Sequence, residues 1–191
     1  MKKLKSENYK TEYINLSPRW LRSIGLLTTM LVSILMTKLF IFKNGKINFW
    51  INDNFLTEIL IVLGIVFIMF FHAFIHCIIW SRFCLNDFSE MDLKFAANNL
   101  IFTCKCRKPL KKTHYIIGKA MPLIIMGITL GILSIIINNG LLLCISIFLT
   151  ITCYGDAAYI IRLVFYKKKI DWVMENPVGR GLIIYRHIQS K

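Results

Sequence analysis

Two histidines four residues apart are the residues of this sequence best suited to chemistry. His72 and His76 both lie in a long apolar run. On a helix, positions i and i+4 share one face and lie one turn apart, so both imidazoles can reach one tetrahedral metal ion. The structural alternative is that each histidine only forms a hydrogen bond to a neighbouring helix. The spacing alone favours that structural alternative, since the pair is metal-binding in about a third of such cases, and a metal site needs a further ligand at the same depth.

A single acid, Asp156, interrupts a later apolar run. A carboxylate in the middle of a membrane helix costs about 2.5–3.5 kcal/mol and normally has a partner. Arg82 lies six positions after His76, and Arg162 lies six positions after Asp156. Each arginine is expected to anchor its helix at the cytoplasmic boundary. At a rise of about 1.5 Å per residue, His76 and Asp156 therefore both lie about 9 Å from that boundary. Arg162 is too far along the helix to pair with Asp156 through an i+3 or i+4 contact. Matching depth therefore predicts that His72, His76 and Asp156 form a three-ligand site with an open fourth position, as in catalytic zinc sites.

These residues are carried by apolar runs in a chain of 191 residues that is 56% hydrophobic, against about 45–50% in soluble domains. A spanning helix needs about 20 mostly apolar residues, and four runs meet this length: 24–42, 55–80, 115–137 and 141–165. Residues 138–140 join the last two runs in a tight turn. We therefore predict an all-α integral membrane fold with about four transmembrane helices. It forms one membrane domain over residues 1–191, with an amino-terminal segment 1–23, a four-helix core 24–165 that includes a loop 83–113, and a tail 166–191.

The basic residues indicate the orientation of these helices. The net charge is +14, and Lys and Arg are concentrated in the amino-terminal segment, the central loop and the tail. The other two connections contain only Lys43 and Lys46. The positive-inside rule then predicts a multi-pass cell-membrane protein with both termini in the cytoplasm, and the lipid bilayer, not nucleic acid, as the partner of this charge. Lys119, near the end of its run, is expected to snorkel to the interface. The six cysteines show no C-x-x-C spacing and are expected to be reduced.

The central loop contains a predicted β-hairpin on the cytoplasmic side. Apolar-rich arms at 92–95 and 100–104 flank a turn at 96–99 that contains two asparagines, and asparagine suits turn geometry. The tail segment 181–185 is a further candidate strand.

The order of these features resembles a family of small bacterial membrane zincin peptidases, related to the site-2 intramembrane metalloproteases. The resemblance covers most of the chain from about residue 55 to the tail. The matching motifs are His72-x-x-x-His76, Lys108-Pro109, Ala120-Met121-Pro122, Gly155-Asp156 and Pro177-Val178-Gly179.

The resemblance implies a helical metalloprotease core that binds Zn²⁺ through His72, His76 and Asp156. It also implies that the hairpin holds the substrate as an added strand. The hairpin residues assigned to this role are Phe95, Asn98, Asn99, Leu100 and Ile101.

One position departs from the family pattern. The family motif is H-E-x-x-H, and this sequence has Ala73 where the glutamate belongs. That glutamate is the general base, which takes a proton from the attacking water and passes it to the leaving amine, and alanine cannot do so. Two explanations fit: a natural pseudoprotease, or a deliberate exchange that traps an inactive form. The intact ligand set favours the exchange, because drift usually erodes ligands as well.

The leading hypothesis is a zinc-dependent intramembrane metalloprotease, here in an inactive form. Its substrates are expected to be membrane-embedded or membrane-anchored peptides or single-span proteins. The alternative is a non-enzymatic membrane protein that binds peptides or serves as an immunity or accessory protein, and Ala73 is its best support. Metal content distinguishes the two hypotheses.

Overall fold

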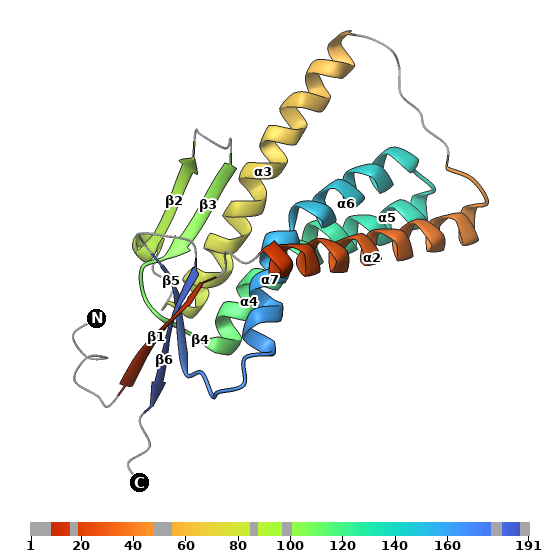
Figure 1. Cartoon of the computed structure of the whole chain (residues 1–191). Coiled ribbons are helices and arrows are strands. Elements are labelled where there is room, and N and C mark those ends of the chain that lie inside the picture. The colour runs from red at the N-terminus through yellow and green to blue at the C-terminus, as the bar shows by residue number, and fades with distance from the viewer. Residues whose placement is uncertain are drawn as a thin grey trace.

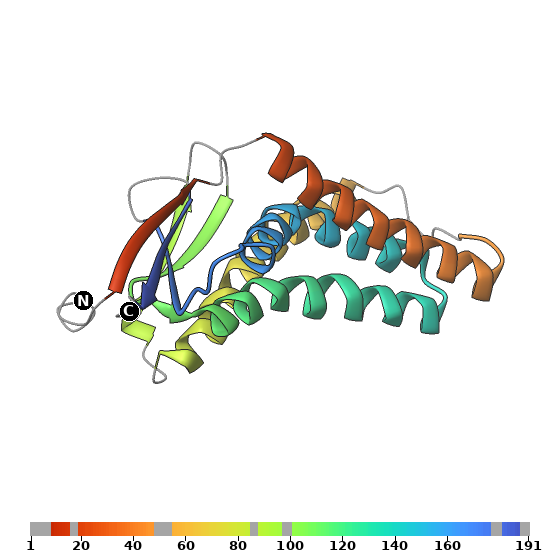
Figure 2. The same cartoon turned by 60° about the horizontal axis from the view of Figure 1, so that its bottom comes forward.

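The computed structural model of the chain describes residues 9–15, 19–47, 55–84, 88–96, 101–176 and 181–187. Within these ranges, the long helices extend from one end of the molecule and the strands lie at the other end (Figures 1 and 2). The candidate metal ligands lie near the junction between the helices and the strands.

The strands form two sheets, so the prediction of an all-α fold is wrong and the fold is mixed α and β. A four-stranded antiparallel sheet has the order β1-β6-β5-β4. Its strands are Tyr9–Asn15 (β1), Leu110–Lys111 (β4), Trp172–Glu175 (β5) and Gly181–His187 (β6). The second sheet pairs Met91–Ala96 (β2) with Ile101–Cys106 (β3). The predicted loop hairpin and the predicted tail strand are therefore both present.

Strand β1 shows why the larger sheet was missed. Its apolar and polar residues do not alternate regularly, and of its seven residues only Ile14 is buried. It is held by a distant partner, because Tyr9 lies opposite His187 along the register with β6. The hydroxyl of Tyr166 also donates to Glu12 at 2.5 Å, and this hydrogen bond lowers the pKa of Glu12. Strand formation that depends on such long-range neighbours leaves little signal in the local sequence.

The helices give three candidate spans, and a fourth if a bent pair is counted as one. The helical segments, in chain order, are Arg19–Asn44 (α2), Phe55–Phe83 (α3), a short 3₁₀ turn at Phe88–Glu90 (η1), Lys112–Pro122 (α4), the π-helical segment Leu123–Ile128 (η3), Thr129–Ile137 (α5), Gly140–Thr152 (α6) and Tyr154–Val164 (α7). Segments α4, η3 and α5 together make one of the candidate spans. The fourth predicted run is broken, since α6 and α7 are bent by 47° around Cys153, which lies between them.

The predicted turn between the last two runs is confirmed. Asn138 adopts a left-handed conformation with φ of 53° and ends α5. Asn139 caps α6 by accepting a hydrogen bond at 2.9 Å from the backbone N–H of Leu142. Both roles are typical of asparagine, which tolerates positive φ and is a favoured N-cap.

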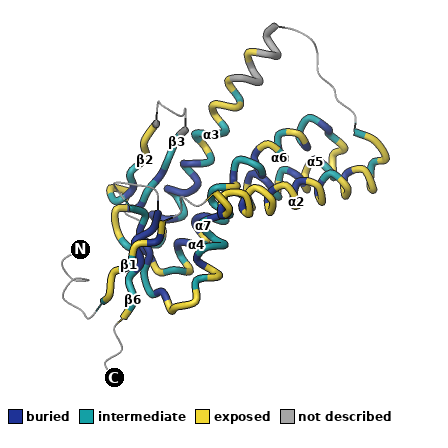
Figure 3. The backbone as a smooth tube through the Cα atoms, in the orientation of Figure 1, coloured by how far each residue is buried: buried dark blue, intermediate teal, exposed yellow. Residues whose placement is uncertain are grey.

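The outer surfaces of the helices are apolar. Much of α2 is exposed (Figure 3), with large apolar side chains at Leu27, Leu31, Ile34, Leu35 and Phe42. An apolar surface of this extent is unusual for a soluble monomer. It is consistent with a membrane location.

The main core joins the sheet to the helix ends. Trp80 of α3, Leu163 of α7, Val173 of β5 and Ile184 of β6 are each fully buried within one cluster. The four-stranded sheet is therefore packed directly on the helices that carry the candidate ligands.

A disulfide connects the hairpin to α3, so the prediction of reduced cysteines is wrong for Cys77 and Cys104. A second pair lies beside it, with the sulfur atoms of Cys84 and Cys106 3.1 Å apart. Burial, together with the contact to Cys84, raises the pKa of the Cys106 thiol to about 12. Since Cys77 directly follows His76, the disulfide holds β3 next to the candidate metal site.

We expect four of the six cysteines to react with an alkylating reagent when the protein is denatured without reductant. Cys77 and Cys104 should react only after reduction, because their sulfurs are bonded to each other. Intact mass spectrometry counts the alkyl groups directly, and the reduced sample, with six groups, is the control. Six groups without reductant would contradict the disulfide.

Candidate metal centre

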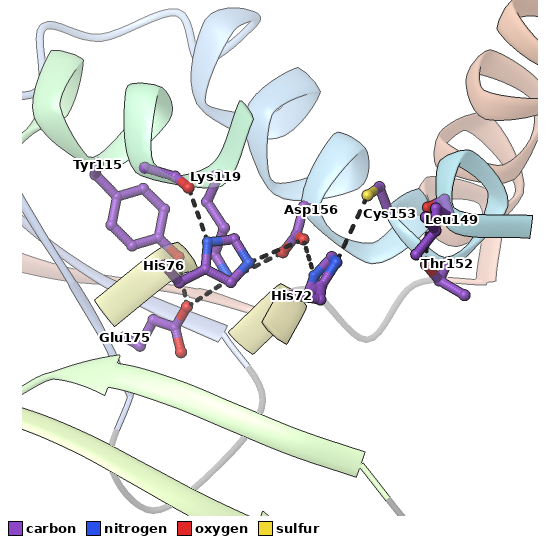
Figure 4. A network of polar contacts seen from close by, with 10 residues as sticks. His72, His76, Tyr115, Lys119, Leu149, Thr152, Cys153, Asp156 and Glu175 are labelled. Atoms are coloured by element: carbon purple, nitrogen blue, oxygen red, sulfur yellow. Dashed lines mark hydrogen bonds and ion pairs between the residues drawn. The ribbon is translucent and has the colours of Figure 1, made fainter. Parts of the chain in front are cut away.

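The three predicted ligands meet at one point between α3 and α7 (Figure 4). The Nε2 atoms of His72 and His76 each lie 3.1 Å from Oδ2 of Asp156. All three potential ligand atoms lie within 4.8 Å of one another. The structure thus brings together the three residues for which the sequence predicts matching depth, and their role as metal ligands stays a prediction.

The hydrogen bond behind His76 determines which of its ring nitrogens faces the site. Nδ1 lies 2.8 Å from the carbonyl oxygen of Gly118, which can only accept, so Nδ1 carries the proton. In the neutral ring, Nε2 then presents a lone pair toward Asp156, whose ionised carboxylate also only accepts. Two acceptors 3.1 Å apart repel each other unless Nε2 is protonated or both bind one cation, and a metal ion bound by both atoms would satisfy the pair. Such an outer hydrogen bond is usual for a histidine that binds a metal.

His72 is held less tightly than His76. Its Nδ1 lies 3.8 Å from the sulfur of Cys153, and 15% of its side chain is exposed, against 5% for His76. His72 therefore forms the more open side of the site. A ligand entering the site would reach it from this side.

The break between α6 and α7 places Asp156 in the first turn of a helix. The positive end of the helix dipole favours a carboxylate there. Helix α2 packs closely against the break, because a Cβ at Gly25 would lie 2.3 Å from the carbonyl oxygen of Tyr154. The bend thus provides a favourable position for an acid within a largely apolar segment.

Two charged residues, Lys119 and Glu175, were not assigned to the site from the sequence. Lys119 does not snorkel: its Nζ lies 3.0 Å from Oδ1 of Asp156 and 3.0 Å from Oε1 of Glu175, with 9% of its side chain exposed. Tyr115 donates a hydrogen bond to Glu175 at 2.8 Å. The signal for Lys119 was a cation four residues inside the start of its apolar run. Glu175, in the tail, had no signal at all.

Beside the ligands lies a cavity of about 370 Å³. Its lining includes residues 102–105 of β3 and, from the helices, His72, Asp156 and Tyr159. Of the predicted substrate residues, Phe95 is half-exposed on β2 and Ile101 opens β3. Asn98, Asn99 and Leu100 lie outside the described residues. The substrate role of all five stays a prediction.

Trp80 connects His76 to the backbone of α4. Its ring stacks on His76 with centroids 5.1 Å apart, and a Cβ at Gly118 would lie 1.9 Å from Trp80 Nε1. We expect Gly118→Ala to displace Trp80 and the carbonyl that orients His76, and to weaken zinc binding by about 10–100-fold, as loss of such outer contacts does.

Zinc affinity measured by competition with a chelator checks this result. The matched control is Gly64→Ala on α3, where a Cβ would meet nothing within 4 Å. That change should leave zinc affinity intact. Equal affinity of the two variants would show that the Gly118 carbonyl does not orient His76.

The comparisons agree with this geometry. A family model described as "Putative zincin peptidase" matches residues 65–170, more than half of the chain. The matched segment contains His72, His76 and Asp156. No curated protein and no solved structure matches the chain.

Proposed function

Because the chain belongs to this zincin peptidase family, we propose that it is a catalytically inactive membrane metallopeptidase whose zinc is bound by His72, His76 and Asp156. The observation that carries the proposal is the convergence of three ligand atoms within 4.8 Å of one another. When bound, zinc supplies a Lewis acid that polarises the scissile carbonyl and lowers the pKa of the attacking water.

The residues of this chain supply orientation. The Gly118 carbonyl holds His76 in the tautomer that exposes Nε2. The lone pair of that nitrogen and Oδ2 of Asp156 then face the same point. Ala73 follows His72 on α3 and has a side chain that cannot exchange a proton. We therefore propose that the chain binds zinc and peptide but does not cleave.

The substrate we propose is an extended stretch of a membrane-anchored peptide or single-span protein. Residues 102–105 of β3 line the cavity beside the ligands. Among the described residues β3 pairs only with β2, so its other edge can accept a peptide as an added strand. The apolar helices support access from the membrane.

The proposed orientation has both termini in the cytoplasm. The sheet supports this orientation. Strand β1 comes from the amino-terminal segment, β4 from the central loop, and β5 and β6 from the tail. Strands of one sheet have to lie on the same side of the membrane, and the positive-inside rule assigns these three basic segments to the cytoplasm. The disulfide between Cys77 and Cys104 would be unusual in the reducing cytosol. Labelling of a cysteine placed in the tail with a membrane-impermeant reagent on intact cells tests the orientation: an unlabelled tail supports it, and a labelled tail would place this face, with its disulfide, outside the cell.

A second candidate function is a non-enzymatic peptide-binding protein, and the specific observation in its favour is Ala73. It would use the same cavity and strand edge without chemistry. It requires no metal, and this separates it from the first proposal.

Zinc content tests the proposal. We expect the purified protein, loaded with Zn²⁺ and freed of excess, to hold one zinc per chain that a strong chelator removes. His76→Ala should lose this zinc, because it removes a ligand. His114→Ala should keep it, because His114 stacks on Phe83 at 4.1 Å and is not one of the three clustered ligands. A zinc-free protein with unchanged stability in His76→Ala would favour the second candidate.

A further inference from the structure

The two oxygens of Asp156 have different partners. Oδ2 faces the Nε2 atoms of His72 and His76, each at 3.1 Å. Oδ1 accepts a hydrogen bond from Lys119 Nζ at 3.0 Å. Only one oxygen of the carboxylate is therefore directed at the point where the histidines converge (Figure 4).

Lys119 is itself held from the opposite side. Its Nζ lies 3.0 Å from Oε1 of Glu175, and Tyr115 donates to that same oxygen. About nine-tenths of the side chains of Lys119 and Glu175 is buried. Turning the ammonium away would leave buried carboxylates unpaired, which is strongly unfavourable. The lysine is thus fixed in position.

Aromatic rings enclose the ammonium. Nζ lies 4.9 Å from the ring centroid of Tyr159 and 5.2 Å from that of Trp80. Each ring face attracts the cation. Trp80 also stacks on His76, so the same ring borders a candidate ligand and the lysine.

A carboxylate can bind a metal ion through one oxygen or through both. Catalytic zinc sites use three protein ligands and keep a fourth position open. If Asp156 bound through both oxygens, the two histidines and one acid would supply four donor atoms, and a water or substrate would have to enter as a fifth ligand. Whatever occupies Oδ1 therefore determines whether the metal would hold four or five ligands when water or substrate is bound.

We propose that Lys119, anchored by Glu175, is a positioning residue of the metal centre. It occupies Oδ1 of Asp156, so that Asp156 would bind a metal ion through Oδ2 alone and a water or substrate would complete a four-ligand site. This inference rests on the proposed zinc site. It also makes β5 part of that site, since Glu175 lies on β5, beyond the segment 65–170 matched by the family model.

The alternative is that Lys119 only links helix α4 to α7 and β5. In that case its loss would reduce stability without changing how the metal is coordinated. The two roles are separated by a measurement of coordination in protein that still binds one metal ion.

Cobalt provides the measurement, because Co²⁺ replaces zinc and its visible absorption weakens as coordination rises from four to five. The full-length protein is loaded with Co²⁺, and bound cobalt is quantified. In Lys119→Met we expect one cobalt per chain with visible absorption about threefold lower, because Asp156 becomes bidentate. Lys119→Arg retains a donor for Oδ1 and should restore the wild-type spectrum. Lys38→Met, which removes an exposed lysine of α2, should leave the spectrum unchanged.

Wild-type absorption in a folded Lys119→Met protein that binds one cobalt would overturn the inference and leave the proposed function standing. Failure of the wild-type protein to bind Co²⁺ or Zn²⁺ would overturn both. If Lys119→Met does not fold, Glu175→Gln replaces it, since it weakens the anchor while keeping the lysine. Glu175→Gln should shift the spectrum in the same direction, and an unchanged spectrum there would reject the anchor and the inference with it.

Discussion

Ala73→Glu is expected to convert the chain into a peptidase that chelators inhibit. The new carboxylate would follow His72 on α3, in the place of the general base of the H-E-x-x-H motif, and would accept a proton from the attacking water. General-base catalysis contributes about 10²–10⁴-fold to a rate, so cleavage should rise from undetectable to readily measured. Mass spectrometry of membrane-anchored peptides incubated with the purified variant in lipid vesicles detects the products.

Ala73→Gln is the matched control for this experiment. Ala73 is only 1% exposed, so any larger side chain has a packing cost, and glutamine carries the same cost as glutamate without a proton acceptor. Only the glutamate variant should cleave, and His76→Ala in that background should abolish cleavage. A folded, zinc-loaded Ala73→Glu protein that leaves a broad panel of membrane peptides intact would contradict the peptidase proposal.

Asp156→Asn is expected to lower zinc affinity by at least about 100-fold, more than the loss of an outer contact does. The amide removes the negative charge from the ligand that lies 3.1 Å from both histidines. It also leaves Lys119 with Glu175 as its remaining carboxylate partner. Breaking a buried ion pair costs about 3–5 kcal/mol when no partner remains, so a smaller but measurable loss of stability should accompany the loss of zinc. Chelator competition and thermal unfolding measure the two effects.

A triple variant separates these two effects. Asp156→Asn with Lys119→Met and Glu175→Gln removes all three linked charges and should recover part of the stability but none of the zinc affinity. Asp171→Asn is the control for loss of an acid, since Asp171 accepts a hydrogen bond from the His187 backbone and is not one of the clustered ligands. Unchanged zinc affinity in Asp156→Asn would remove Asp156 from the ligand set.

Features set by neighbouring residues could be predicted from the sequence. The i, i+4 spacing of His72 and His76 places both on one face of α3 wherever that helix packs. Long apolar runs indicate spans whatever their partners are. The asparagines at 138 and 139 make a turn through their own backbone and side chains. These features depend on residues within a few positions of one another, so a local pattern records them.

Features that depend on distant contacts were decided only by the tertiary structure. Strand β1 exists because Tyr9 pairs with His187, and Cys77 is oxidised because β3 brings Cys104 to it. Lys119 is buried because Asp156 and Glu175 approach it from α7 and β5. A charge in an apolar run has the same sequence signature whether it snorkels to an interface or is paired inside the protein. The free energy that separates these outcomes comes from partners far along the chain, and only the folded structure shows which partners are present.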